Sequence, residues 1–181
     1  DGNDALDFMD GSDLGTAAIS LTLPLVENTG SSTTEISLVN PQGSTATVEI
    51  ELFNSAGKRV SSHKATIAAR GALQGLLSSL FATSYNEVAG LRVRSDRPVL
   101  CFGYILRQGG SSLVTVAAQN SGLAAKTLYF PQLAQGDIWS TSIGVLNLTN
   151  TEAAVTITAY RPDGTLFSAP TVQENPVTKN L

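Results

Sequence analysis

The single histidine and the single cysteine come first, because a thiol beside an imidazole can act as a nucleophile. His63 lies in a polar run next to a turn, whereas Cys101 alternates with Val99 and Gly103 in an apolar run. A free cysteine in such a strand packs as a small buried hydrophobe. One cysteine and one histidine also supply neither a disulfide nor a zinc ligand set. We therefore predict no catalytic residue, no cofactor and no enzymatic activity.

Carboxylates recur at every third position of the N-terminal segment, and calcium prefers such oxygen ligands. The residues are Asp1, Asp4, Asp7, Asp10 and Asp13. Their spacing does not match the loop of an EF-hand, which needs a closing Glu at its twelfth position. The segment is therefore interpreted as a solvated acidic tail, with calcium binding by these five aspartates as the alternative.

Aromatic side chains raise the possibility of a sugar platform, since binding modules often stack such rings on their ligands. Trp139 is the only tryptophan, and Tyr129 lies ten residues before it. In a strand, Trp139 would share a face with Ile143 and Val145, which favours inward or interfacial packing. Both interpretations of these aromatic residues stay open.

An internal repeat connects two parts of the chain at a constant offset of 107 residues. Pro24, Asn40, Val48 and Gly57 recur as Pro131, Asn147, Val155 and Gly164. A period of this length matches one immunoglobulin-like sandwich, not one turn of a solenoid. Asn147-Leu148-Thr149 matches a glycosylation sequon, but its counterpart Asn40-Pro41-Gln42 does not, so the shared asparagine is expected to serve a turn.

The elements of each copy follow from the residue pattern. Apolar residues alternate with polar ones over 34–38, 48–52 and 113–118, which predicts half-buried antiparallel strands. Residues 90–94 and 99–106 predict two further strands joined by the turn Ser95-Asp96-Arg97-Pro98. The leucine spacing near 72–85 follows a helical rhythm and predicts one short helix. The predicted fold is all-β, with immunoglobulin-like antiparallel β-sandwich repeats.

Three segments follow from the period. Residues 1–20 form an acidic segment or the tail of a preceding repeat, 21–126 the first repeat, and 127–181 a second, incomplete repeat. A sheet with unpaired edges aggregates unless something covers it. Completion could come from the first residues, from packing of the two related units, from further sequence, or from a second molecule, and therefore from self-association.

The outward positions of the two copies differ in charge. Glu35, Glu49 and Glu51 of the first copy correspond to neutral residues of the second. Charged faces keep sheets apart, whereas small neutral faces permit close packing. We expect the second face to be covered by the chain or by a partner, and the candidate interaction residues, with the two aromatic ones, are Ser142, Gly144, Thr156, Thr158, Trp139 and Tyr129.

Composition narrows the functional class. The formal net charge is −4 and only 14% of residues are charged, so binding to nucleic acid by bulk charge is excluded. The polarity comes from 38 serines and threonines. No apolar run approaches the roughly 18 residues that a membrane helix needs, and no membrane insertion is expected.

The framework motifs resemble tandem β-sandwich modules of large secreted or cell-surface proteins of bacteria. They are Phe130-Pro131, the Ala-x-Val-x-Ile strand at 153–157, Asp163-Gly164, and the run from Gly90 to Val99. The resemblance implies an extracellular or cell-envelope module without catalysis, acting as a spacer or as a protein interaction domain. A module that binds carbohydrate or another ligand is the alternative.

Overall fold

The computed structural model describes residues 16–29, 31–81, 88–107, 112–131, 133, 141–169 and 174–181. It is an antiparallel all-β protein, which confirms the predicted fold class. The elements are β1 (Ala18–Leu23), β2 (Ser32–Val39), β3 (Ala46–Asn54), β4 (Arg59–Ile67), β5 (Ala72–Leu76), α1 (Leu77–Leu80), β6 (Val88–Arg107), β7 (Ser112–Ala117), β8 (Gln119–Asn120), a 3-10 turn (Ser121–Leu123), β9 (Ala154–Ile157) and β10 (Val177–Asn180). The chain divides into two compact units, residues 1–145 and 146–181.

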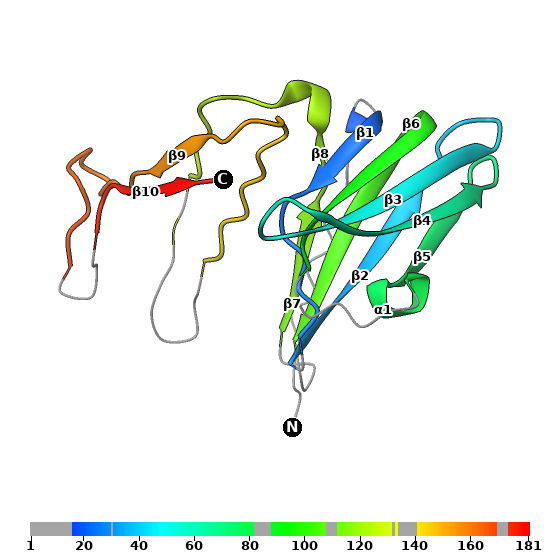
Figure 1. Ribbon diagram of the computed structural model, residues 1–181, viewed down its shortest axis with the longest axis horizontal. Helices are drawn as coiled ribbons and strands as arrows, with labels where there is room; N and C mark the ends of the chain where they lie inside the picture. Colours follow the sequence, from blue (N-terminus) through cyan, green and yellow to red (C-terminus); the bar gives the residue numbers. More distant parts are fainter. Residues whose placement is uncertain are drawn as a thin grey trace. The chain divides into compact units, whose positions relative to one another are not determined.

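The first unit is built around β6, a strand of 20 residues that takes part in two layers (Figure 1). Its first half pairs with β1 and β3, and its second half pairs with β2 and β7. β4 and β8 extend the first layer, and β5 extends the second. Two facing layers that share one long strand form a sandwich-like fold, in which β1 begins at Ala18.

The turn expected at Ser95-Asp96-Arg97-Pro98 does not form, because β6 runs through these residues. Side chains replace the regular ladder at this point. The Thr47 amide donates to Asp96 Oδ1 (2.7 Å), and Arg97 Nε donates to the Thr45 carbonyl (3.1 Å). The β1 register also shifts between Ala18 and Ser20. A bulge tolerates the missing N–H of Pro98, so these residues mark the passage between layers instead of a hairpin.

The helix expected near 72–85 is also largely wrong. Residues 72–76 form β5, which pairs with β2 and places Leu73 opposite Leu38, and the helix covers only Leu77–Leu80. Residues 82–87 lie outside the described part. β2 needs a partner on this edge, and the backbone hydrogen bonds gained there outweigh the weak helical rhythm of five residues.

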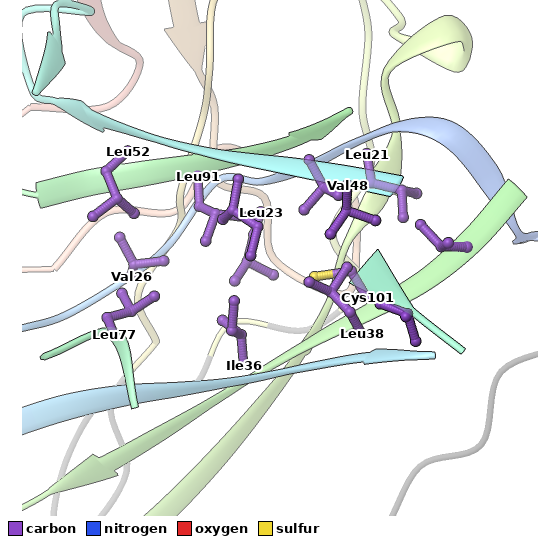
Figure 2. Close-up of a cluster of buried hydrophobic side chains, with 14 of the residues drawn as sticks. Leu21, Leu23, Val26, Ile36, Leu38, Val48, Leu52, Leu77, Leu91 and Cys101 are labelled. Carbon is purple, nitrogen blue, oxygen red and sulfur yellow. The ribbon is translucent and has the colours of Figure 1, made fainter. Parts of the chain in front are cut away.

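Apolar side chains from both layers fill the interior between them (Figure 2). Leu21, Leu52 and Leu91 come from one layer, and Ile36 and Leu38 from the other; each is at most 1% exposed. Burial of a side chain of this size contributes roughly 1.5–3 kcal/mol. Gly103 admits the Leu23 side chain, since a Cβ at Gly103 would lie 2.5 Å from Leu23 Cδ2. The core therefore fixes both layers of the first unit.

The second unit contains the hairpin of β9 and β10. Val155 and Ile157 are half-buried and alternate with exposed Ala154 and Thr156. The Asn175 side chain continues the pairing, because its amide donates to the carbonyl oxygens of Ala159 (2.8 Å) and Phe167 (2.7 Å). Among the described residues of 146–181 no side chain is fully buried. This unit therefore rests on backbone pairing more than on a core.

Candidate functional site

The structure separates the histidine from the cysteine. His63 lies on β4 opposite Ile50, and its ring meets the edge of Phe81 at a centroid distance of 5.8 Å. Cys101 lies on β6 opposite Leu38, 4% exposed, and burial raises the pKa of its thiol to about 12. The thiol is therefore neutral at physiological pH, and the nucleophile is the thiolate. Each residue packs as a structural side chain.

The five N-terminal aspartates lie outside the described residues, so the structure does not bear on calcium binding there. Within the ranges that are described, no group of three or more histidine, cysteine or carboxylate side chains is placed to hold a metal ion. In the same ranges no helix has the length and apolarity to cross a membrane.

The predicted interaction residues are distributed over both units. Tyr129 is 91% exposed, whereas Trp139 lies outside the described residues. Ser142 is exposed, and Gly144 lies so close to Pro24 that a Cβ at Gly144 would be 2.5 Å from the Pro24 carbonyl oxygen. A glycine is required there by this close approach.

The two threonines of this set belong to the second unit. Thr156 is exposed on β9, and its hydroxyl lies 2.9 Å from that of Thr178 on β10. Thr158 follows β9 and is half-buried. The structure thus brings Thr156 and Thr158 together on one strand, with Ser142 and Gly144 on a different segment.

A buried carboxylate is the strongest electrostatic feature of the first unit. Glu51 is 5% exposed and pairs with Arg92 (2.8 Å), Arg59 (3.0 Å) and Arg94 (3.3 Å). The Arg92 guanidinium also lies 5.0 Å from the centroid of the Phe53 ring. Burial raises the pKa of Glu51, but hydrogen bonds from Arg92 and Arg59 and the charges of Arg92 and Arg94 outweigh it, so the pKa lies below its ordinary value of 4.5.

The sequence pattern placed Glu51 on a solvated outer face, and this interpretation is wrong. Its neighbours explain why: β3 lies between β4 and β6, and the register brings Arg59 and Arg92 to the same face. The alternation of Arg92 and Arg94 along the strand was the signal, because it puts two cations on one face. The four charges neutralise one another in part and hold three strands together.

A shallow depression lies at the far end of β2 and β6. It is lined by Glu27, Thr29, Ser31, Ser32 and Arg107, and Arg107 pairs with Glu27 at 3.2 Å. A salt bridge with both partners partly exposed contributes little and binds no ligand by itself. The depression has the polarity of ordinary surface.

Large apolar side chains are exposed after the 3-10 turn. Leu123, Leu128, Tyr129, Phe130 and Leu133 are each between 49% and 91% exposed. Single exposed apolar residues are normal on protein surfaces, but a run within eleven residues marks a site of interaction. Their counterparts at the 107-residue offset include Leu21 and Leu23, which are buried in β1.

The fold and this surface define the class as an antiparallel all-β sandwich without an assembled catalytic set among the described residues. No protein-family model matches the chain, and no curated protein matches it. Two solved structures are similar. A protein titled Thermotoga maritima 1070 shares 18% identity over 58% of this chain and 96% of its own, with a TM-score of 0.49. The Anabaena sensory rhodopsin transducer shares 14% identity over 47% of this chain and 92% of its own, with a TM-score of 0.39.

Proposed function

We propose that this protein is a non-catalytic interaction module in which the first sandwich is the rigid framework and residues 123–181 make contact with a protein partner. The exposed run from Leu123 to Leu133 carries the proposal. Leu128 and Phe130 are 62% and 51% exposed, whereas their counterparts Leu21 and Leu23 are 1% and 0% exposed. Covering a Leu and a Phe of this exposure contributes on the order of 25 cal/mol per Å² of apolar surface.

The immunoglobulin-like repeat and the bacterial cell surface belong to the same proposal and are supported by the framework motifs of the sequence. Equivalent turns of the two copies have the same hydrogen bonds. Gly57 donates to the Asn54 carbonyl (3.0 Å) and Gly164 to the Arg161 carbonyl (2.9 Å), and both glycines have positive φ, 71° and 84°. A spacer role follows if several such modules are joined in series.

A photo-crosslinking amino acid at position 129 tests the interaction function in the organism that encodes the protein. We expect covalent adducts with a protein of one defined mass from position 129. The matched control is position 58 in the β3–β4 turn, which is equally exposed to solvent and far from the apolar run in sequence. Absence of an adduct at 129, or the same adducts from both positions, would contradict the proposal.

Carbohydrate binding is the second candidate, because Tyr129 is 91% exposed beside the half-exposed ring of Phe130. An exposed ring can stack on the apolar face of a sugar. Tyr129→Ala would then abolish retention on a polysaccharide column, whereas Tyr160→Ala, at a ring that is 63% exposed on the second unit, would leave it unchanged. Equal retention of Tyr129→Ala and the natural protein would exclude this candidate.

A further inference from the structure

β9 pairs along one edge only. Its partner is β10, with Val155 opposite Lys179 and Ile157 opposite Val177. Ala153 and Leu181 exchange both backbone hydrogen bonds (3.0 Å each), so the antiparallel alternation also turns the N–H and C=O groups of Val155 and Ile157 toward β10. Ala154 and Thr156 therefore direct their backbone groups to the opposite edge. Within the described ranges no strand pairs with that edge.

The strand that corresponds to β9 in the first unit is β3, at the offset of 107 residues. The two hairpins close in the same way. Asn54 accepts from Gly57 and donates to the Lys58 carbonyl (3.0 Å), as Arg161 accepts from Gly164 and donates to the Thr165 carbonyl (2.8 Å). The pair Phe53 and Arg59 likewise corresponds to the bridge between Tyr160 and Leu166.

The strand starts correspond as well. Asn40 Nδ2 donates to the carbonyl oxygens of Ser44 (2.8 Å) and Ile67 (3.1 Å). Asn147 Nδ2 donates to those of Thr151 (2.7 Å) and Leu181 (3.1 Å). One asparagine thus holds the start of β3 next to the end of its partner strand, and the other does the same for β9. The local geometry of β9 is that of β3 at both ends.

β3 has a second partner that β9 lacks. β3 pairs with β4 on one edge and with β6 on the other, where Ile50 lies opposite Val93 and Leu52 opposite Leu91. Val48 and Ile50 are 1% and 0% exposed, whereas Val155 and Ile157 are only half-buried. The first unit therefore shows what covers this edge: a strand with the apolar alternation of β6.

We propose that the open edge of β9 accepts an extended strand of the β6 type from a polypeptide segment outside residues 1–181, and this rests on the interaction function proposed above. Addition of a strand satisfies the backbone groups of Ala154 and Thr156 and gives affinity through main-chain hydrogen bonds. The β6 strand of a second copy is not the donor. It pairs with β1, β2, β3 and β7 of its own unit, and its removal would expose Leu91, Val93 and Cys101.

The charge pattern specifies the donor further. Arg94 lies opposite Glu49, and Arg92 lies opposite Glu51, with which it forms an ion pair. The positions of these two glutamates are occupied by Thr156 and Thr158 in the second copy. A guanidinium placed against a hydroxyl would lose water without gaining an opposite charge. The donor strand therefore carries neutral residues where β6 carries Arg92 and Arg94.

Two synthetic peptides test this with the intact 181-residue protein. One has the sequence of residues 88–100, and the other the same sequence with R92T and R94T; both carry a solubilising lysine tail. Fluorescence anisotropy and amide hydrogen exchange are the readouts. We expect the neutral peptide to bind at least tenfold more tightly than the arginine peptide and to slow exchange at Ala154 and Thr156. A scrambled neutral peptide should do neither.

Two proline variants locate the binding edge. Thr156→Pro removes an N–H on the open edge of β9 and should abolish binding of the neutral peptide. Thr178→Pro removes an N–H from the outer edge of β10 and loses the same hydroxyl contact between Thr156 and Thr178 (2.9 Å), so it is the matched control and should bind normally. Normal binding by Thr156→Pro, or loss of binding in Thr178→Pro alone, would overturn the assignment to β9.

The remaining outcomes also decide the question. If the neutral peptide leaves the exchange of Ala154 and Thr156 unchanged while position 129 still crosslinks to a protein partner, strand addition is wrong and the interaction function stands. If neither is observed, both proposals fail. Concentration-dependent dimerisation that protects the β9 amides without any peptide would assign the edge to a second copy and would equally refute the donor proposed here.

Discussion

Glu51 shows how one residue can hold three strands together. Its carboxylate accepts from Arg59 on β4 and from Arg92 on β6, and it is almost completely buried. We expect Glu51→Gln to lower the free energy of unfolding by about 2 kcal/mol, because the neutral amide loses hydrogen bonds to charged groups. Urea unfolding followed by circular dichroism measures this. The control is Glu35→Gln, on β2 opposite Leu76 and Tyr104, which should change stability by less than about 0.5 kcal/mol.

The same residue sets a pH dependence. The pKa of Glu51 lies below its ordinary value of 4.5 in the folded protein. Stabilisation from a lowered carboxyl pKa is fully present above pH 4.5 and is lost as the pH falls through the folded value. The stability difference between the natural protein and Glu51→Gln should therefore be constant from pH 7 to pH 5 and shrink below pH 4.5. A difference that grows on acidification would refute the role of these ion pairs.

At the scale of elements, the asparagine before each strand offers an internal comparison. Asn40 is 0% exposed, and its amide donates to three carbonyl oxygens, of Ser44, Ile67 and Ala68. Asn147 makes two such bonds at an exposed position. Asn40→Ala should cost about 3 kcal/mol, since a buried carbonyl left without a donor costs about 1–3 kcal/mol.

Asn147→Ala should leave the urea midpoint unchanged and accelerate amide exchange at Leu181 and Ala153, which Asn147 holds in register. The two substitutions are chemically identical, so a difference between them reports burial alone. Equal loss of global stability in both variants would show that the second unit contributes to the cooperative core, contrary to its exposed side chains.

How far the elements could be predicted depends on whether the deciding contacts are local. Strict alternation over 34–38 and 48–52 predicted β2 and β3 correctly, because period two has no other regular structure. Ser95 to Pro98 has the composition of a turn, but Thr45 and Thr47 on another strand keep β6 extended. The rhythm of Leu73, Leu76 and Leu77 suits a helix or an edge strand, and pairing with β2 decides between them.

The candidate site divides in the same way. The exposed position of Tyr129 and the pairing of Thr156 follow from alternation and from the repeat, which are visible in one sequence. The burial of Glu51 is not, since it depends on the register of three strands that lie up to 41 residues apart in the chain. Charge alternation along 92–94 showed that a cationic face exists, but only the fold shows that Glu51 lies beneath it.

At the scale of the whole molecule, the two units differ in what stabilises them. The fully buried side chains belong to residues 18–105, whereas the described side chains of 146–181 are exposed or half-buried. Local opening is governed by buried apolar contacts, so hydrogen exchange should be much faster in β9 and β10 than in β6. This contrast makes the second unit the part of the chain that an added strand can stabilise most.

Cys101 provides a direct measurement of that difference, because it reports opening of the first unit alone. Its thiol is 4% exposed and has a pKa raised to about 12 by burial, so a maleimide or disulfide reagent at pH 8 should not react with the folded protein. Labelling should rise only at the urea concentration that unfolds β6, and Glu51→Gln should shift that midpoint downward. The amides of β9 and β10 should exchange well before it. Rapid labelling in the absence of urea would show that the core around Cys101 opens as readily as the second unit, and would contradict the division of stability between them.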